Sequence, residues 1–427
     1  MRYGPRQPFD RESNKLVPTI YSEIEQYFVP MVEALPSDIE GVDDLTPAIE
    51  LFGALVNLKR FDDAFSVYQQ RLGHPLMFQF SAASTIVELL TLFFPNGLEA
   101  PSILVDEGKQ EYVLSQLATA SSFNGMLSQA IQLGQRFIEM AKGNKSAQNL
   151  SVGYENLSRV LLTSGRLYEA ERTIRLALQI ASSQDSSRRV LMRSHLEKIQ
   201  LIRNANVDNI NIAGEKVALK PNASFESLAD QAEAELLKGN LSAARGFADS
   251  AFESTMRYRA AGQLVRVERI RGEIALAFGD LKDAQNYLQS ALVRARTINL
   301  VAEELPALIG LAELNRRCGE HGTAREFLDD VWNNAERGSF VLAHADALNV
   351  LVQIERDSAN IEKAADAATR AYRAAWCDGI SIDEILNFSY WRALQIAKNH
   401  LDAIGLPYPT LPPFDPSRAE PMPSDVL

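Results

Sequence analysis

Histidine and cysteine, the residue types best suited to metal binding and nucleophilic chemistry, are few and lie far apart in this sequence. The two cysteines, Cys318 and Cys377, form no CxxC pair, and no histidines form HExxH or another close metal-binding spacing. Neither a G-x-S-x-G elbow nor a G-x-x-x-x-G-K-[ST] phosphate loop occurs. The histidines are His74, His195, His321, His344 and His400. The sequence therefore predicts no catalytic residue, no bound metal and no cofactor.

Cys377 and His400 are one candidate nucleophilic pair. Cys377 and His400 could in principle meet in the folded chain, but no nearby residue is suited to orienting the imidazole. We expect instead that Cys377 packs beneath a C-terminal helix. His321 replaces an apolar residue in a repeated turn, which predicts a structural side chain.

Charged side chains give a stronger pattern than the histidines and cysteines. Arg and Glu recur ahead of a repeated turn, at positions three, six, ten and thirteen residues before it, which share one face of a helix. Their guanidinium groups could hold a carboxylate or phosphate by paired hydrogen bonds, or the two charges could neutralise one another between neighbouring helices. Both alternatives are open. The predicted partner-binding residues are Glu155, Arg159, Glu233, Arg266, Arg269, Glu273, Glu313, Arg316, Asn349 and Gln353.

The turn itself is a six-residue motif: a small residue, any residue, an apolar residue, two residues of any kind, and Ala. Its copies are 40 residues apart, except for an interval of 74 that holds a weaker copy at 205–210. A further copy at 59–64 begins with Lys59, and the copy at 319–324 has His321 at the apolar position. The regular copies begin at Gly125, Gly165, Gly239, Gly279, Gly319 and Ala359.

Each motif position has a physical role in a helix–turn–helix unit. Glycine adopts the backbone conformation that ends a helix, and Asp280 or Asn240 after it could cap the next helix. The apolar third residue should anchor the turn in the core, and the sixth-position Ala lets two helices approach closely. Seven residues later comes another mainly small residue on the same helix face: Ala177, Ala251, Ala291, Val331 and Ala371.

These units match the tetratricopeptide repeat pattern, in which helical hairpins of about 34 residues stack because none can bury its apolar face alone. The predicted fold is an all-α, right-handed superhelical solenoid of such hairpins, with repeats of 40 residues. The first helix of each hairpin would line a concave groove, which is where we expect the charged residues to lie.

The ends of the chain predict a division into five segments. They are a flexible lead at 1–18, helical hairpins and a long connection at 19–108, the repeat array at 109–380, a capping helix at 381–404, and a proline-rich tail at 405–427. Within the second segment, residues 78–94 should form one apolar helix. Seven prolines exclude a helix from the tail, which is either an extended strap or disordered.

Composition narrows the function classes. The chain has 427 residues and 46% hydrophobic residues, and 43 Lys and Arg against 55 Asp and Glu give a net charge of −12. An acidic balance argues against a general nucleic-acid binder. Two isolated cysteines and the absence of a visible signal sequence predict a cytoplasmic protein. The most apolar window, 86–94, is too short to span a membrane.

Two segments resemble a known family. The sequence AWCDG at 375–379, the helix end LDAIG at 401–405 and LPPFDP at 411–416 resemble the end of the C-terminal sensor region of bacterial STAND/NACHT-type signalling NTPases. Residues 45–98 resemble the start of that region. The resemblance implies that the array binds a trigger and releases a neighbouring nucleotide-binding module, often in anti-phage defence. This chain departs from the family because it has no phosphate loop of its own.

The sequence therefore predicts a non-catalytic sensor that binds a protein or peptide trigger in its concave groove, in a bacterial signalling or anti-phage defence system. An NTPase or effector enzyme would be a second partner, and no membrane is involved. Alternatively, the array is a regulatory subunit that holds a separately encoded protease or nuclease inactive. A third possibility is the effector-binding domain of a transcription regulator, although no helix-turn-helix segment is evident at either end.

Overall fold

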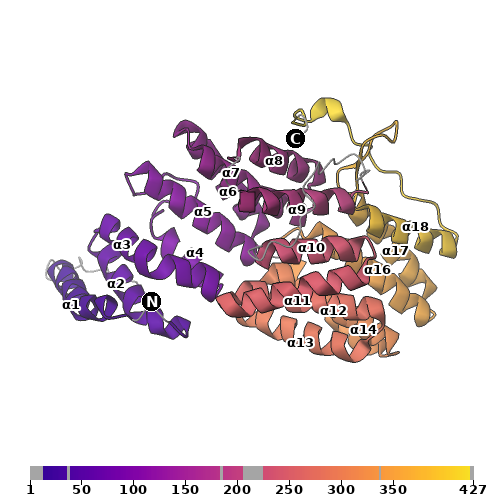
Figure 1. Ribbon diagram of the computed structural model, residues 1–427, viewed down its shortest axis with the longest axis horizontal. Helices are drawn as coiled ribbons and strands as arrows, with labels where there is room; N and C mark the ends of the chain where they lie inside the picture. The colour runs from indigo at the N-terminus through magenta and orange to yellow at the C-terminus, as the bar shows by residue number, and fades with distance from the viewer. Residues whose placement is uncertain (1–12, 36–38, 183–185, 205–224, 336–337, 424–427) are drawn as a thin grey trace, which may run out of the picture. The chain divides into compact units, whose positions relative to one another are not determined.

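The computed structural model describes residues 13–35, 39–182, 186–204, 225–335 and 338–423, and it divides the chain into two compact units, 1–113 and 114–427. Both units are helical (Figure 1). The described part of the chain holds one pair of two-residue strands, near its C-terminal end. The predicted all-α fold of stacked helical hairpins is confirmed.

The first unit has a core of aromatic rings. Phe52 lies edge-on to Phe93 at 5.6 Å and to Tyr68 at 6.3 Å, and all three side chains are fully buried. The predicted helix over 78–94 is wrong, because Ser81 takes a left-handed conformation with φ 51° and separates two helical segments. The helices are α1 (Ser13–Glu33), α2 (Thr46–Asn57), α3 (Phe61–Val67) and α4 (Ala83–Thr91), with short helical turns at Val42–Leu45, Tyr68–Leu72 and Pro75–Gln79.

From residue 127 onward, the helices of the second unit pack in sequence order, each against the next. The weak motif copy at 205–210 lies outside the described residues. The helices are α5 (Glu107–Phe123, which begins in the first unit), α6 (Leu127–Gly143), α7 (Ala147–Thr163), α8 (Leu167–Ile180), α9 (Ser186–Ile202), α10 (Phe225–Leu237), α11 (Leu241–Tyr258), α12 (Ala261–Phe278), α13 (Leu281–Thr297), α14 (Val301–Arg317), α15 (His321–Ala335), α16 (Val341–Asp357), α17 (Ile361–Trp376) and α18 (Trp391–Ile404).

The repeated glycines end the first helix of each hairpin, as their spacing predicts. All five have φ between 78° and 83°, and Ala359 accepts the same left-handed region at φ 59°. Asp280 caps α13 by accepting a hydrogen bond from the Asp283 amide, whereas the Asn240 side chain makes no cap. The motif therefore encodes the turn through backbone conformation more than through capping.

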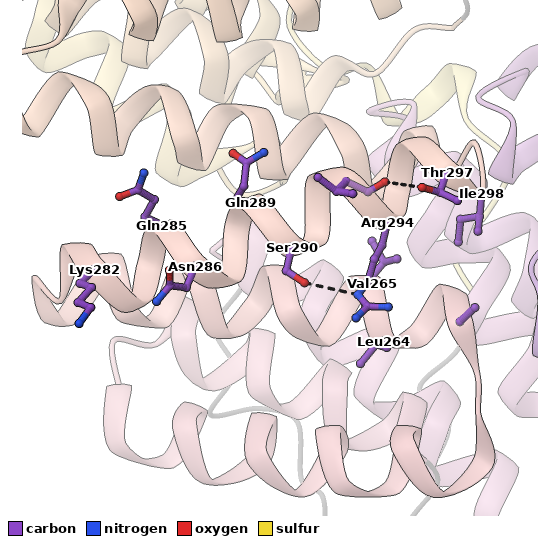
Figure 2. Close-up of a pocket in the computed structure, with 12 residues that line it drawn as sticks. Leu264, Val265, Lys282, Gln285, Asn286, Gln289, Ser290, Arg294, Thr297 and Ile298 are labelled. Carbon is purple, nitrogen blue, oxygen red and sulfur yellow. Dashed lines mark hydrogen bonds between the residues drawn. The ribbon is translucent and has the colours of Figure 1, made fainter.

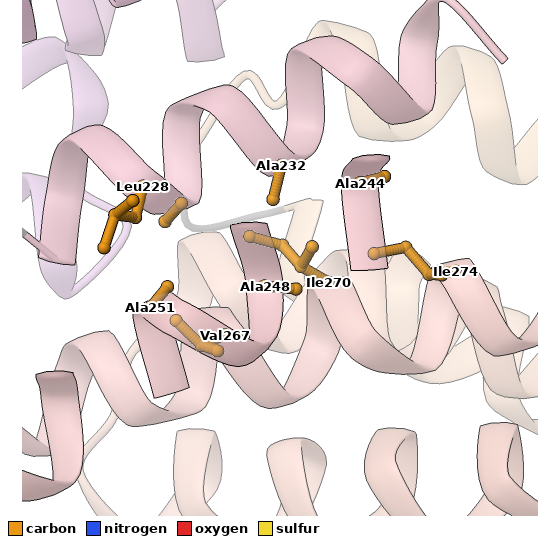
Figure 3. Packing of buried hydrophobic residues seen from close by; sticks show 9 residues of the cluster. Leu228, Ala232, Ala244, Ala248, Ala251, Val267, Ile270 and Ile274 are labelled. Carbon is orange, nitrogen blue, oxygen red and sulfur yellow. The ribbon is translucent and has the colours of Figure 1, made fainter. Parts of the chain in front are cut away.

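Small residues bring the helices together. Ala232 on α10, Ala244 and Ala248 on α11, and Ile270 on α12 meet in one buried cluster (Figure 3). The sixth-position alanines and the small residues seven positions later are buried throughout the array. The third position behaves differently: Leu127 and Leu167 are buried, but Leu241 and Leu281 are partly exposed, so the prediction that it anchors every turn is wrong for the later repeats.

The second unit folds back on itself, so that early turns touch late helices. The Asn299 side-chain amide donates to Asn124 Oδ1 at 3.0 Å across 175 residues of sequence. The turn at Gly125 lies against Val301 at the start of α14. The turn at Gly165 lies against Val341 at the start of α16. The stack is therefore held by contacts between distant repeats as well as between neighbours.

The predicted capping helix over 381–404 is too long by ten residues. Strands β1 (Gly379–Ile380) and β2 (Asn387–Phe388) pair as an antiparallel hairpin, and α18 begins only at Trp391. The chain leaves α17 through Cys377 at φ 50° and Gly379 at φ 90°, two left-handed residues that no continuing helix could contain.

The proline-rich tail is an extended strap over 405–423, one of the two predicted alternatives, with a single 3-10 turn at Pro416–Arg418. The Trp376 indole donates to the Pro412 carbonyl at 2.9 Å, and the Phe414 amide donates to the Ile380 carbonyl at 3.0 Å. The Phe414 ring lies 5.0 Å from Tyr168 at the start of α8. Further along, Glu420 forms an ion pair with Arg172 at 2.5 Å. The strap thus ties the last repeat to an early one.

Candidate binding site

Six of the ten predicted partner-binding residues belong to one connected set of ion pairs, which we call the charge network. Its members come from α7, α9, α10, α12 and α14, and spacings of three and four residues place several of them on one face of their own helix. The network comprises Glu155, Arg159, Arg188, Lys198, Asp230, Glu233, Arg266, Arg269, Glu273 and Glu303.

The centre of the charge network is Arg266 on α12. Its guanidinium contacts Asp230 Oδ1 at 2.5 Å and Glu233 Oε2 at 2.6 Å, both on α10. Glu233 also receives Lys198 Nζ at 2.6 Å, and it pairs with Arg269. Apart from Lys198, which is partly exposed, these side chains are almost entirely buried. The arginines and carboxylates therefore neutralise one another between neighbouring repeats, which is the second of the two alternatives that the sequence left open.

The carboxylates of the network differ in how well they are compensated. Burial alone would raise the pKa of Asp230, but the charges of Arg159 and Arg266 outweigh it and hold that pKa well below its usual range. At the two ends of the charge network, desolvation outweighs the attraction of the neighbouring arginines. Burial raises the pKa of Glu155 despite Arg159, and it raises the pKa of Glu273 despite Arg269. The centre is thus saturated with positive charge, whereas the ends are short of it.

Asp346 on α16 is a further undercompensated carboxylate. The Tyr390 hydroxyl donates to its Oδ2 at 3.0 Å. Burial raises the pKa of Asp346 to about 7, and the negative charge of Glu273 also raises it. A cation placed beside this carboxylate would be bound favourably.

Four of the predicted residues lie outside the charge network. Arg316 pairs with Glu313 at 2.7 Å and with Asp357 at 2.8 Å, which forms a separate group on α14 and α16. Asn349 is buried and donates to the Ala393 carbonyl of α18 at 3.0 Å, so it holds the end helix in place. Gln353 is partly exposed.

Sequence reasoning missed four members of the network. Counting back from Gly239 selected Ala229, one position from Asp230, and counting from Gly319 stopped at Pro306, one turn short of Glu303. Arg188 and Lys198 lie on α9, whose turn motif is the weak copy at 205–210. Extending the count by one turn would have found Glu303, but no signal marked the phase of α9.

A crevice of about 80 Å³ opens beside the charge network, between α5, α6 and α7. Arg159 lines it and is also a member of the network, with 32% of its side chain exposed. Its ion pairs are the loosest there, at 3.3 Å to Asp230 and 3.8 Å to Glu155. The remaining walls are mainly small or apolar: Ser115, Ala118, Thr119, Ser122, Phe123, Ala130, Gly134, Phe137, Gly153, Asn156, Leu157 and Val160. An apolar recess therefore adjoins an accessible cation.

A buried Ser–His pair lies between α7, α8 and α9. Ser158 Oγ is 3.1 Å from His195 Nε2, and the Ser158 hydroxyl donates to the Ala170 carbonyl at 2.7 Å. Burial, with the nearby charge of Arg159, holds the pKa of His195 well below its usual range. Both side chains are buried, and the hydroxyl proton is already engaged, so this pair joins three helices and is not arranged as a nucleophile and base.

The possible Cys377–His400 dyad does not form. Cys377 Sγ contacts the Ala374 carbonyl at 3.7 Å, and His400 Nε2 has no hydrogen-bond partner. Burial raises the pKa of the Cys377 thiol to about 12, the opposite of what an activated nucleophile requires. Among the described residues, no three His, Cys, Asp or Glu side chains are placed to hold a metal ion. Nor does any described helix combine the length and apolar character needed to cross a membrane.

Comparisons with known proteins give distant structural likenesses. A Rap protein complexed with competence and sporulation factor shares 13% identity over 92% of this chain and 98% of its own, with a TM-score of 0.36. A STAND protein with a tetratricopeptide repeat sensor from Pyrococcus horikoshii shares 12% over 93% and 66%, with a TM-score of 0.41. Yeast Tom70 shares 13% over 91% and 90%, also with a TM-score of 0.41. No protein-family model and no curated protein matches the sequence.

Proposed function

We propose that this array is a non-catalytic binding module for a protein or peptide segment, which docks where the charge network meets the crevice. The observation that carries the proposal is the position of Arg159, which lines the apolar recess and belongs to the network with loose ion pairs. An extended peptide offers both an apolar side chain for the recess and charged groups for its rim. The groove on the first helices of the hairpins is the surface that we propose for the rest of the segment.

The energetics of the charge network support a role in binding. Burying ion pairs rarely stabilises a fold, because desolvation offsets the attraction between the charges. Glu155, Glu273 and Asp346 each have a pKa raised by burial, so a ligand cation beside any of them would recover free energy that folding leaves unused. We therefore propose a segment that carries a basic side chain as well as an apolar one.

A single methyl group tests this site. A Cβ added at Gly134 would lie 3.5 Å from Leu157 Cδ1, an ordinary contact, and alanine is favoured within a helix. Gly134→Ala therefore narrows the crevice without strain. Peptides would be selected from a random displayed library on the full-length chain, and their affinities measured by fluorescence anisotropy. We expect affinity to fall about tenfold in Gly134→Ala.

Gly246→Ala on α11 is the matched control, because a Cβ there would contact nothing within 4 Å and the position does not line the crevice. Its peptide affinity should equal that of the wild type. Peptides that bind all the variants equally well would place the binding site elsewhere on the molecule.

The biological context that we propose is bacterial signalling or anti-phage defence, with a separately encoded NTPase or effector as a second partner. Its support is the resemblance of residues 45–98 and 375–416 to STAND sensor regions. Co-expression with the products of neighbouring genes, followed by purification of the complex, tests it. Recovery of the array alone would count against such a partner.

A further inference from the structure

Two isoleucines protrude from the end of the array. Ile382 and Ile385 lie in the loop between β1 and β2, and they are 87% and 77% exposed. Between them stand Asp383 and Glu384, both exposed. We call residues 382–385 the isoleucine tip. Large apolar side chains are seldom so exposed, and two on one protrusion, beside two acids, are typical of a contact surface.

The isoleucine tip is held rigidly by hydrogen bonds around Ser381. The Ser381 amide donates to the Leu386 carbonyl at 2.8 Å, and the Leu386 amide donates to Ser381 Oγ at 2.9 Å. The Ile385 amide donates to Asp383 Oδ1 at 3.2 Å. Because the loop is ordered before binding, little conformational entropy would be lost when its isoleucines are covered.

A second feature of the same unit complements this tip. A groove of about 940 Å³ runs along α13 and the start of α12 (Figure 2). Leu264, Val265 and Val293 give it apolar walls, and Lys282 and Arg294 are the charged residues that line it. No carboxylate of the described residues lines the groove, although the chain as a whole is acidic. Arg294 is paired with Glu268 at 3.2 Å, so Lys282 supplies the positive charge that faces the acids of the tip, and the apolar walls match its isoleucines.

We propose that the isoleucine tip of one copy docks into the α12–α13 groove of a second copy. The isoleucines pack against Leu264 and Val293, and Glu384 lies near Lys282, which makes no ion pair within the described part of its own chain. Within the described part of one copy, both surfaces stay uncovered. Because tip and groove are different surfaces, the contact is head-to-tail and repeats from copy to copy into a ring or a filament. It does not depend on peptide binding at the charge network.

Sedimentation velocity of the full-length chain over a concentration series tests the contact. We expect wild-type chains to self-associate as concentration rises, and the double variant Ile382→Asp/Ile385→Asp to do so at least about tenfold more weakly. Glu384→Lys alone and Lys282→Glu alone should each weaken association about two- to fivefold. All four positions are exposed, and a thermal melt of each variant confirms that it folds.

Mixing the two charge variants gives the sharpest result. The lysine tip of Glu384→Lys faces the glutamate groove of Lys282→Glu, and the remaining tip and groove are of wild-type sequence, so the mixture should associate as strongly as the wild type. A wild type that stays monomeric at every concentration overturns the proposal. So does association that the tip variant leaves intact, or a mixture no stronger than its two components.

Discussion

The turns of the array form two groups that share a backbone conformation and differ in what surrounds them. The early turns are those at Gly125 and Gly165, and the late turns are those at Gly239, Gly279 and Gly319. Gly165 and Gly279 have φ of 78° and 82° in equivalent motif positions. A Cβ at Gly165 would lie 2.7 Å from Val341 Cβ, whereas one at Gly279 would contact nothing within 4 Å. In the late turns the glycine only allows the left-handed backbone conformation. In the early turns it also leaves room for the distant helices that pack against them.

The largest expected effect is the difference between alanine at these two positions. Gly279→Ala forces a side chain into a left-handed conformation and should cost about 1 kcal/mol. Gly165→Ala adds overpacking against a stiff β-branched side chain and should cost about 3 to 4 kcal/mol in all. Urea unfolding followed by circular dichroism measures both. Equal costs would mean that the turn at Gly165 does not pack against α16 in solution.

The third motif position should repeat this difference on a smaller scale. Leu167 is fully buried and Leu281 is partly exposed. We expect Leu167→Ala to lower the free energy of unfolding by about 3 kcal/mol and Leu281→Ala by about 1 kcal/mol, since a cavity forms only where the side chain is enclosed. The same urea titrations provide the measurement. Similar losses at the two positions would argue against coverage of the α7–α8 turn.

Features that depend on residues within one repeat could be predicted from the sequence, whereas contacts between distant repeats could not. The spacing of glycine and alanine recurs within each repeat, so the hairpins and their turns could be predicted. The contact of Gly165 with Val341 joins residues that no short motif links, and the strap's approach to Tyr168 depends on how the whole array curves. Even so, the aromatic Tyr168 indicated that something covers this turn, because late repeats have Ser242, Lys282 and Gly322 at the equivalent position.

The candidate site shows the same limit. The helix-face count selected Arg159, Arg266 and Arg269 correctly, since the spacing of side chains on a helix is a local property. Their ion-pair partners depend on which helices meet and in what register, so Asp230 was missed by one position. The crevice between α5, α6 and α7 could not be foreseen at all, because it is a property of three-helix packing.

A pH-dependent contact at the early turn comes next in size. Asp378 accepts a hydrogen bond from the Tyr168 amide at 2.8 Å and thereby caps α8 from 210 residues away. Burial raises the pKa of Asp378 from its usual 3.8 to about 6. The folded chain thus binds this proton more tightly than the unfolded chain. The associated stability is complete below pH about 4 and is lost as pH rises through about 6.

Replacing Asp378 with Asn keeps a side-chain acceptor for the Tyr168 amide and removes the titration. Between pH about 4 and 7, the wild type should lose roughly 2 kcal/mol of stability relative to Asp378→Asn. Unfolding free energies of both proteins across that range give the result. Parallel profiles would show that this carboxyl titrates normally and is not enclosed by the early turn. Asp280, which caps a late turn from within its own repeat, supplies the control variant Asp280→Asn.

The smallest effect concerns reactivity without any change in the fold. Cys318 is exposed in the late turn before Gly319, whereas Cys377 lies in the segment that covers the early turn, with its pKa raised to about 12 by burial. At pH about 8 only about one Cys377 in ten thousand would be a thiolate, so iodoacetamide should modify Cys318 first and Cys377 at least about a hundredfold more slowly. Mass spectrometry of timed samples measures the two rates.

Phe414→Ala, which loosens the strap over Tyr168, should speed modification of Cys377 and leave Cys318 unchanged. Equal rates in the wild type would mean that the segment opens readily, and the distinction between early and late turns would then hold for packing in the stack but not for closure by the strap.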